Sequence, residues 1–328
     1  MSPLRVGICV NKRKCEKLKF RENTKKFADH GIELVIIDMD CDLEQQGPFD
    51  IIIHKVLDYS EESAASGVEK TEILRQYAKT HKNDVVMVDS IELTEKVADR
   101  VEMTKILQSC EMTVDNIKVF VPKSTLIQEG TSMEEVQHIL KKESFQFPIL
   151  SKPVSSACNL NAHDITLIFS DEFLADLPIP CIIQEFCNHG GILYKVFMMG
   201  DSYRTCERPS IKNFSCHTQP SIFFDTRNIS KTNKPYQPEL HGFDPLTAKW
   251  RSSDDDPNML NNNVVQKIVK EITKTWGVSL SGLDIIIEEG TGNYGIIDLN
   301  YFPGYDGVGQ HFVEDLSNFL LRIKSHEP

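Results

Sequence analysis

Three oxygen-bearing side chains near the end of the chain have the types and spacing of a magnesium site. Asp284 lies in an apolar run over residues 283–288, whereas Asp298 and Asn300 lie in a second run over residues 294–300. A turn rich in Gly, Thr and Asn separates the two runs, and this pattern predicts a β-hairpin. Mg²⁺ commonly takes a few hard oxygen ligands of this kind and completes its octahedron with water and phosphate oxygens.

The register of this hairpin decides whether the two carboxylates meet. A loop over residues 289–293 makes Glu288 face Tyr294, and this register places Asp284 opposite Asp298. The amide two positions further along projects on the same face, because side chains alternate along a strand. Carboxylates directly across a ladder repel each other unless a positive charge lies between them. An exposed hairpin with solvated acids is the alternative, but the Ile and Leu neighbours favour a metal site.

A glycine pattern in the same stretch has a simpler explanation than its letters suggest. Residues 290–295 match G-x-G-x-x-G. A dinucleotide site needs that turn to open a helix, so that the pyrophosphate lies at the helix N-terminus. Here a second strand follows, so we interpret the glycines as turn residues with positive φ. The chain also lacks a P-loop sequence. A magnesium site without a P-loop suggests a nucleotide held between two sheets.

Composition indicates an enzyme-sized chain of two or three domains. The chain has 328 residues, a formal net charge of −12 and nine scattered cysteines without a C-x-x-C pair. The acidic balance argues against bulk nucleic-acid binding. The cysteine pattern favours reduced thiols in the cytosol or nucleus and argues against zinc. We expect no membrane insertion, because no apolar run approaches the length of a bilayer-spanning helix.

The elements that must position these residues begin with a small doubly wound α/β domain over residues 1–93. Short apolar strands are predicted at residues 4–10, 33–38, 49–54 and 84–88, with helical segments between them. Strands that alternate with helices in this way are typical of a parallel sheet covered on both faces.

A basic segment follows the first predicted strand. Residues 11–21 contain six Lys or Arg residues, among them Lys14. They stand at the carboxyl end of a strand, where open α/β sheets bind ligands. A solvated helix start is the common explanation of such a run. In so acidic a protein, however, it is the main candidate for attracting a polyanion.

Residues 94–187 are expected to form an α+β unit. The pattern predicts one helix over residues 94–110, a second helix over 132–142 with a capping box, and a strand over 147–152 that ends at Lys152. A phosphate beside Lys152 would keep its ammonium charged even if it is buried, although a solvated strand-end lysine is the more common case.

Residues 188–328 are expected to form a third unit that contains the metal hairpin. Lys195 lies inside an apolar run, where an unpaired charge is rarely buried, so a phosphate is a natural partner. The polar segments 213–230 and 232–263 are interpreted as loops, and the chain closes with a helix over residues 312–323.

Long blocks of this sequence resemble the inositol-1,3,4-trisphosphate 5/6-kinase family, also called the inositol-tetrakisphosphate 1-kinase family. The resemblance covers nearly the whole chain and implies the ATP-grasp fold. In that fold two α+β domains grip ATP beside a Rossmann-like N-terminal α/β domain. The blocks that carry the resemblance are residues 49–55, 193–197, 208–215, 282–287 and 297–305.

The resemblance implies a role for each matching residue. It implies ATP contacts at Arg100, Lys152, the segment 184–195 with Gln184, Glu185 and Lys195, and at Ser210, Thr226 and Ser230. It implies inositol-phosphate contacts at Lys14, His163, Lys195, Asn300 and Gly304. It implies metal ligands at Asp284, Asp298 and Asn300, the trio reached above from the hairpin alone, and it makes Lys195, His163 and Asp298 the candidate catalytic residues.

The sequence departs from the family pattern at two positions that bear on the site. The loop over residues 153–161 lacks the family's Gly-rich, basic character and is one residue longer, which affects the alignment of His163. Thr226 replaces a serine and keeps the hydroxyl.

The resemblance implies an ATP-dependent inositol polyphosphate kinase that moves the γ-phosphoryl group of ATP to an inositol hydroxyl with the help of two Mg²⁺ ions. We expect ATP and an inositol tris- or tetrakisphosphate as small-molecule partners, a monomer, and a location in the cytoplasm, with the nucleus as a second location left open. One alternative is an ATP-grasp carboxylate–amine ligase, against which the basic segment argues. Another is a catalytically weak sensor of inositol phosphates, which the loop at 153–161 keeps open.

Overall fold

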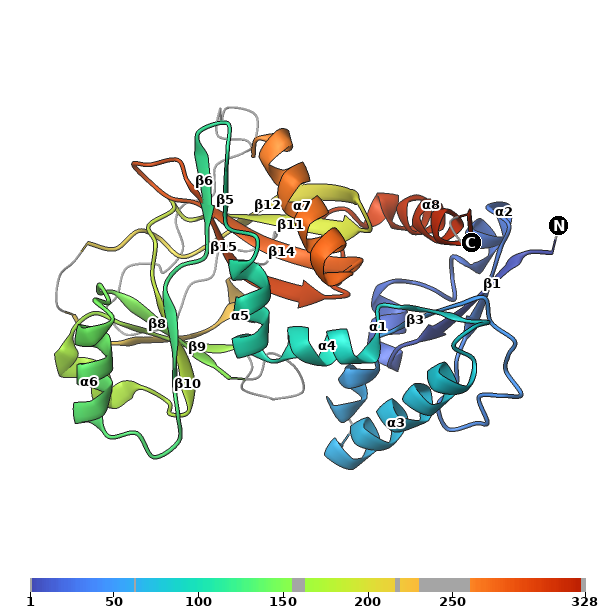
Figure 1. Cartoon of the computed structure of the whole chain (residues 1–328), viewed down its shortest axis with the longest axis horizontal. Coiled ribbons are helices and arrows are strands. Elements are labelled where there is room, and N and C mark those ends of the chain that lie inside the picture. The colour runs from blue at the N-terminus through green and yellow to red at the C-terminus, as the bar shows by residue number, and fades with distance from the viewer. Residues whose placement is uncertain (1, 62, 155–162, 216–218, 230–259, 326–328) are drawn as a thin grey trace.

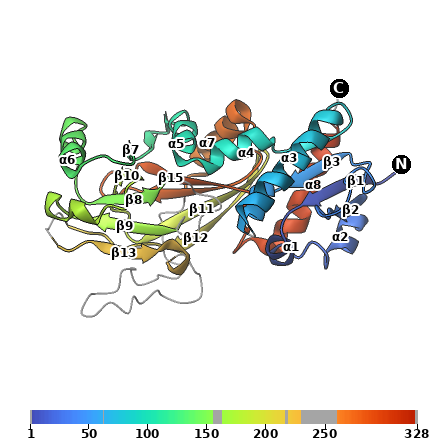
Figure 2. The ribbon, with the colours of Figure 1, turned by 90° about the horizontal axis from the view of Figure 1, so that it is seen from below.

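The computed structural model describes residues 2–61, 63–154, 163–215, 219–229 and 260–325 of the chain. These residues form three sheets of four, five and six strands, and the four-stranded sheet belongs to the N-terminal domain (Figure 1). Figure 2 shows the other two sheets on the same side of that domain, with β8 and β9 next to β11 and β15. The described helices include none with the length and apolar composition that a bilayer crossing requires.

The N-terminal sheet is parallel, with the strand order β2-β1-β3-β4, and its four strands confirm the predicted ones. The strand order reverses between β1 and β3, so the crevice outside their carboxyl ends is the position where such sheets bind ligands. The basic helix α1 begins at this crevice. The main elements of the domain are β1 (Leu4–Cys9), α1 (Lys12–Lys17), α2 (Thr24–Asp29), β2 (Ile32–Ile36), β3 (Ile51–His54), α3 (Ala64–Thr80) and β4 (Val86–Val88).

Two helices, not one, connect this domain to the rest of the chain. The prediction of a single helix over residues 94–110 is wrong, because α4 (Ile91–Ala98) ends and α5 (Arg100–Gln108) begins at Asp99. The backbone of Asp99 is extended, with φ −83° and ψ 116°, and its carboxylate caps α5 by accepting hydrogen bonds from two backbone N–H groups. The break therefore places Arg100 in the first turn of a new helix.

The middle sheet is antiparallel, with the order β13-β9-β8-β10-β7. Helix α6 begins with the predicted capping box and buries Val136 and Leu140 in the cluster on one face of this sheet. The expectation of a loop over residues 213–230 is wrong in part, because β13 pairs with β9 and buries Phe224. The elements are β7 (Ser124–Ile127), α6 (Met133–Lys142), β8 (Ile149–Pro153), β9 (Asp164–Ile168), β10 (Cys181–Glu185) and β13 (Ile222–Asp225).

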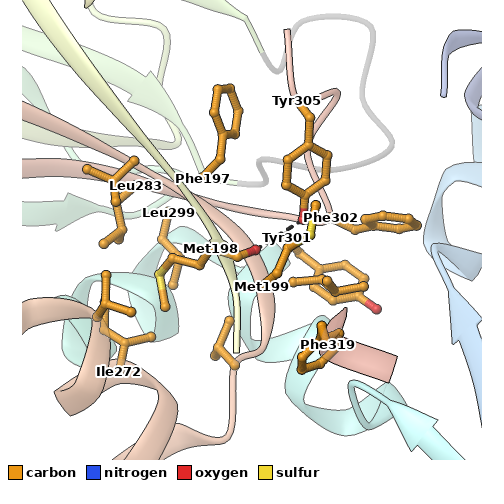
Figure 3. Packing of buried hydrophobic residues seen from close by; sticks show 14 of the residues in the cluster. Phe197, Met198, Met199, Ile272, Leu283, Leu299, Tyr301, Phe302, Tyr305 and Phe319 are labelled. Carbon is orange, nitrogen blue, oxygen red and sulfur yellow. Dashed lines mark hydrogen bonds between the residues drawn. The ribbon is translucent and has the colours of Figure 1, made fainter. Parts of the chain in front are cut away.

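The C-terminal sheet has the order β12-β11-β14-β15-β6-β5, so strands β5 and β6 join it although they precede the middle sheet in the chain. One face of this sheet packs Leu283 and Leu299 with Ile272 of α7, and on the other face Phe197 packs against Tyr305, whose hydroxyl donates a hydrogen bond to the Met198 carbonyl oxygen (Figure 3). The elements are β5 (Met112–Val114), β6 (Ile117–Phe120), β11 (Ile192–Met199), β12 (Ser202–Pro209), α7 (Asn262–Trp276), β14 (Leu280–Ile287), β15 (Tyr294–Tyr301) and α8 (Phe312–Ser325).

A buried polar cluster joins the N-terminal domain to the C-terminal sheet, and Tyr301 is at its centre. The Tyr301 hydroxyl donates a hydrogen bond to the His54 carbonyl oxygen at 2.7 Å and accepts one from the Asp89 backbone N–H at 3.2 Å. His54 lies at the end of β3 and its ring Nε2 is 2.7 Å from the Asp89 carbonyl oxygen. Since a carbonyl oxygen can only accept, that nitrogen carries the proton.

The carboxylate of Asp89 completes this cluster. It accepts hydrogen bonds from the backbone N–H groups of Ser279, at 2.9 and 3.0 Å, and Leu280, at 3.2 Å. Burial raises the pKa of Asp89 to about 6, although these N–H groups act in the opposite direction. Burial also lowers the pKa of His54 to about 4. Both side chains therefore favour their neutral forms more than they would in water.

Candidate active site

The β14–β15 hairpin places Asp284 opposite Asp298, as predicted. The predicted register near the turn is wrong, however, because Ile287, and not Glu288, faces Tyr294. A β-bulge adjacent to Asp284 shifts the ladder by one residue and so brings the two carboxylates opposite each other. The predicted pairing of the two carboxylates is therefore correct, because the different register at the turn and the bulge each shift the ladder by one residue and cancel.

The bulge also supplies an acceptor for Lys152 of the middle sheet. Ile297 is the extra residue, since Asp298 pairs with Asp284 and Ile296 pairs with Ile285. Its carbonyl oxygen accepts a hydrogen bond from Lys152 Nζ at 3.0 Å. Burial lowers the pKa of Lys152 to about 8, and the nearby carboxylate of Asp298 acts against this. The strand-end lysine is thus held at the metal hairpin and not in solvent.

Lys195 extends the pair of carboxylates into a row across three strands. It lies on β11 directly opposite Asp284, so Lys195, Asp284 and Asp298 share one face of the sheet. Its Nζ is 2.8 Å from Oδ1 and 3.2 Å from Oδ2 of Asp284. Burial alone would lower the pKa of Lys195, but the Asp284 carboxylate raises it above its ordinary value. Lys195 is therefore the cation that lets the facing acids coexist in this structure.

Asn300 completes an oxygen donor set that fits Mg²⁺. Its Nδ2 donates a hydrogen bond to Asp298 Oδ2 at 2.9 Å, which leaves the amide oxygen for another partner. Oδ1 of Asp284 is buried without a geometrically acceptable hydrogen bond, although it lies close to Lys195. Nowhere in the described part of the chain do three His, Cys, Asp or Glu side chains gather as a metal cage. Two carboxylates and an amide suit an ion that takes its other ligands from water and phosphate.

Arg100 adds a second cation from α5. Its side chain is buried, and its Nη1 donates a hydrogen bond to the Pro153 carbonyl oxygen at 2.5 Å. Burial lowers the pKa of Arg100, and the negative charge of Asp298 opposes that effect. The residue after the break at Asp99 therefore faces the same carboxylate as Lys152.

The other predicted ATP residues lie around the strand ends of the middle sheet. Gln184 is on the same face of this sheet as Lys152, whereas Glu185 faces the opposite side, where its carboxylate accepts hydrogen bonds from Lys123 Nζ and the Gln146 N–H. Any contribution of Glu185 to the Lys152 side must therefore come from its backbone.

Thr226 and His163 lie side by side where β13 ends and β9 begins. The Thr226 hydroxyl is 3.3 Å from Nδ1 of His163, and the Thr226 N–H donates to the His163 carbonyl oxygen at 3.0 Å. Burial, and then Arg227, lowers the pKa of His163. Ser230 and most of the loop over residues 153–161 lie outside the described residues.

The predicted substrate residues Lys14 and Gly304 meet at the exit of the hairpin. Lys14 is buried, and its Nζ donates to the carbonyl oxygens of Phe302 and, at 2.6 Å, of Pro303. Burial lowers the pKa of Lys14 well below its ordinary value. A Cβ at Gly304 would stand 2.3 Å from the end of the Lys17 side chain, so that side chain would have to move to admit any other residue there. The structure brings this pair to the hairpin that carries Asp298.

Two residues at this site were not singled out from the sequence. Arg208 is buried on β12, on the same face as Lys195, and its Nη2 donates to the Asp306 carbonyl oxygen. It lies in the block 208–215 that carries the family resemblance, so a signal was present. His189 is buried beside Ser210, and the sequence included it only within the segment 184–195, for which the resemblance implies ATP contacts.

Two family models match this chain. The inositol 1,3,4-trisphosphate 5/6-kinase pre-ATP-grasp domain matches residues 5–93, and the inositol 1,3,4-trisphosphate 5/6-kinase ATP-grasp domain matches residues 113–322. Curated relatives include two proteins named inositol-tetrakisphosphate 1-kinase. The one from Danio rerio is 32% identical over 96% of this chain and 78% of its own length, and the one from Xenopus laevis is 32% identical over 97% and 78%.

Solved structures show the same fold at low sequence identity. D-cycloserine synthetase DcsG superposes with a TM-score of 0.60 and 10% identity, over 96% of this chain and 99% of its own. The ATP-grasp ligase PsnB complexed with a minimal precursor gives a TM-score of 0.59 and 12% identity, over 98% and 99%. This likeness confirms the predicted ATP-grasp architecture, and at such identities it says nothing about the reaction.

Proposed function

Because this chain belongs to the inositol 1,3,4-trisphosphate 5/6-kinase family, we propose that it transfers the γ-phosphoryl group of ATP to a hydroxyl of an inositol tris- or tetrakisphosphate. The observation that carries this proposal is the row of Lys195, Asp284 and Asp298, which Lys152 approaches from the other sheet. Such a cluster of opposite charges suits phosphoryl transfer, which depends mainly on positioning and on neutralising the charge of the phosphates.

Asp284, Asp298 and Asn300 would hold two Mg²⁺ ions in this proposal. Bound Mg²⁺ would neutralise charge on the phosphate oxygens and align the transferred group. Asp284 would contribute to one ion, Asn300 to the other, and Asp298 to both. The support is the oxygen donor set described above, in which Oδ1 of Asp284 forms an ion pair with Lys195 at 2.8 Å but no well-directed hydrogen bond.

Lys152 and Arg100 would steady the phosphates of ATP. Both cations lie within electrostatic reach of Asp298, and burial lowers the pKa of each. A polyphosphate at this position would offset that effect and keep both side chains charged. Gln184, the backbone of Glu185, and the remaining hydroxyl-bearing residues would hold the nucleoside; these are Ser210, Thr226 and Ser230.

The inositol phosphate would lie between the hairpin exit and the N-terminal domain. Lys14 and Gly304 meet there, at the crevice outside β1 and β3. Lys195, Asn300 and His163 would then contact the ring phosphates from the side of ATP. With the acceptor on one side and Lys152 on the other, the hydroxyl could approach the γ-phosphorus in line, and Lys195 and Asp298 would act at the reacting atoms.

We further propose that the chain acts as a monomer in the cytoplasm and does not bind nucleic acid. Support comes from the net charge of −12 and from the described cysteines, all of which are free thiols.

One assay tests the reaction. The protein is incubated with MgATP and a panel of inositol tris- and tetrakisphosphates, and the products are separated by charge. We expect one added phosphate on at least one acceptor and an equal amount of ADP. Tight binding of inositol phosphates without any product would favour a sensor. ADP formation only with a carboxylic acid and an amine would favour a ligase, and either result would overturn the proposal.

A further inference from the structure

The linker between the middle and C-terminal sheets is tied closely to the segment that follows β12. Asn188 and Phe214 exchange two hydrogen bonds of 2.9 Å, one in each direction. The Asn213 side-chain oxygen accepts from the N–H groups of His189, at 3.0 Å, and Gly190, at 2.8 Å. The linker backbone turns here with a positive φ of 65° at Gly190, which favours glycine. His189 is therefore held in one place by its backbone.

The ring of His189 lies between two oxygen atoms. Its Nδ1 is 2.7 Å from the Cys187 carbonyl oxygen, and its Nε2 is 2.7 Å from Ser210 Oγ. A carbonyl oxygen can only accept, so Nδ1 carries a proton. The ring is 7% exposed, and burial lowers the pKa of His189, so the ring is neutral at pH 7. Nε2 then has no proton, and the Ser210 hydroxyl must donate to it.

This arrangement fixes what the Ser210 hydroxyl can offer to a ligand. A hydroxyl has one proton and two lone pairs, and here the proton is already used. Toward any third group, Ser210 Oγ is an acceptor only. A phosphate or keto oxygen is an acceptor too and would not be complementary, whereas an N–H or O–H group would be.

The surroundings of Ser210 suit a nucleoside better than a phosphate. Cys206 is opposite Lys195 in the ladder, and Ser210 follows Cys206 by four residues. At about 3.3 Å per residue, Ser210 is therefore roughly 13 Å along the strand from the charged row. Next to it the His189 ring packs against Phe186, with ring centroids 5.6 Å apart. Phe186 itself borders an apolar cluster between the sheets.

We propose that His189 fixes the Ser210 hydroxyl as a hydrogen-bond acceptor toward the nucleoside of ATP, and that this pair selects nucleotides with a donor at that position. His189 is thus a positioning residue, and the donor is either a ribose hydroxyl or the exocyclic amine of adenine. The inference rests on the proposed function, because it takes ATP as the ligand.

The test is a binding experiment on the full chain, which does not require turnover. Isothermal titration measures the Kd of ATP, of inosine triphosphate, which has a keto group in place of the amine, and of 2′-deoxy-ATP and 3′-deoxy-ATP, all with Mg²⁺. In the wild type we expect one analogue to bind about 3- to 10-fold more weakly than ATP, as the loss of one neutral hydrogen bond predicts. Which analogue is affected distinguishes the amine from each ribose hydroxyl.

Variants then connect that discrimination to the pair. Ser210→Ala should bind ATP and the affected analogue equally, and Ser210→Thr should restore the difference. His189→Gln can place its amide oxygen near the position of Nε2 and should keep the difference. His189→Asn can still donate to the Cys187 carbonyl oxygen but cannot reach Ser210, so this variant should lose the difference in Kd between ATP and the analogue. In turnover assays the loss should appear as a raised KM for ATP with kcat unchanged.

Two results would overturn the inference. One is a wild type that binds all four nucleotides equally; the other is a Ser210→Ala variant, with an unchanged Tm, that still discriminates. If the wild type binds no MgATP at all, the proposed function fails and this inference fails with it. If it binds MgATP with the expected discrimination but phosphorylates no inositol phosphate, only the proposed reaction fails.

Discussion

The β14–β15 hairpin carries a buried polar cluster on each of its two faces, and the clusters differ in how far they are satisfied. On one face, Tyr301 meets His54 and Asp89, and among the hydrogen-bonding groups of these three side chains His54 Nδ1 alone lacks a protein partner. On the other face, Asp298 meets Asp284 and a set of cations that exceeds the carboxylates by one, since Lys195, Lys152 and Arg100 oppose two acids.

We interpret this difference as one between a structural polar cluster and the proposed functional one. Buried polar groups that satisfy one another stabilise a contact and need no ligand. Buried charges with an excess of cations and an unbonded carboxylate oxygen cost free energy unless a further charged group joins them. The first cluster has no excess of cations and leaves one ring nitrogen, His54 Nδ1, without a partner, whereas the second is suited to Mg²⁺ and a polyphosphate.

Asp298→Ala should abolish phosphoryl transfer, with kcat reduced by about 10³-fold or more, because the residue belongs to the proposed metal site. The free energy of unfolding should change little, because the relief of repulsion between the facing carboxylates offsets the loss of the negative charge beside Lys152 and Arg100. Steady-state kinetics and urea denaturation measure the two effects. The control is Asp315→Ala, which breaks an ion pair with Arg204 outside this cluster and should retain turnover. Normal turnover in Asp298→Ala would show that the open cluster is not the reaction centre.

The pH dependence of stability should reveal opposite contributions of Asp89 and His54 inside the Tyr301 cluster. Because burial raises the pKa of Asp89 to about 6, its contribution is present below its ordinary pKa of 3.8 and is lost as pH rises through 6. Because burial lowers the pKa of His54 from 6.5 to about 4, its contribution is present above 6.5 and is lost as pH falls toward 4. Between pH 4 and 6 the two nearly cancel in the wild type.

Each single variant should reveal the contribution of the group that remains. For a pKa shift of about two units, this contribution changes the free energy of unfolding by about 3 kcal/mol at most. As the pH falls from 6 to 4, the free energy of unfolding of Asp89→Asn should decrease relative to wild type. That of His54→Gln should increase. Urea denaturation across this pH range measures both. Parallel pH profiles for wild type and both variants would mean that these groups titrate normally and that the cluster is not closed to water.

Tyr301→Phe should lower the free energy of unfolding by about 1–3 kcal/mol, because the buried His54 carbonyl and Asp89 N–H groups lose their partner. The kcat should change less than twofold, since the phenyl ring keeps the packing of the strand. Urea denaturation and kinetics on the same preparation give both numbers. A large loss of kcat at unchanged stability would assign Tyr301 to the reacting face and remove the contrast.

Lys14→Met tests a residue that belongs to neither cluster. Its ammonium already has the Phe302 and Pro303 carbonyl oxygens as partners, yet it lies at the proposed acceptor crevice. We expect the KM for inositol phosphate to rise about 3- to 10-fold and the KM for ATP to stay unchanged, as for one lost hydrogen bond. A loss of stability with both KM values unchanged would place Lys14 with the structural contacts.

The sequence predicted the Asp298 face of the hairpin better than the Tyr301 face. Alternation with period two and a Gly-rich turn were enough to bring Asp284 and Asp298 together. The bulge at Ile297 has no signature in a run of apolar residues, so the acceptor for Lys152 could not be foreseen. The break at Asp99 was missed because no Gly or Pro marks it. The Tyr301 cluster depends on residues over 200 positions apart, such as Asp89, which local patterns cannot connect.

The single hydrogen bond from Lys152 to the bulged Ile297 carbonyl spans the gap between two sheets, and it has a thermodynamic consequence. Any outward swing of the middle sheet must break it and replace the carbonyl acceptor with water. An incoming polyanion offers that ammonium new oxygens, so it lowers the cost of the swing as it arrives. Without ATP, the enzyme should therefore favour the closed arrangement of the two sheets, and bound ATP should reduce that preference.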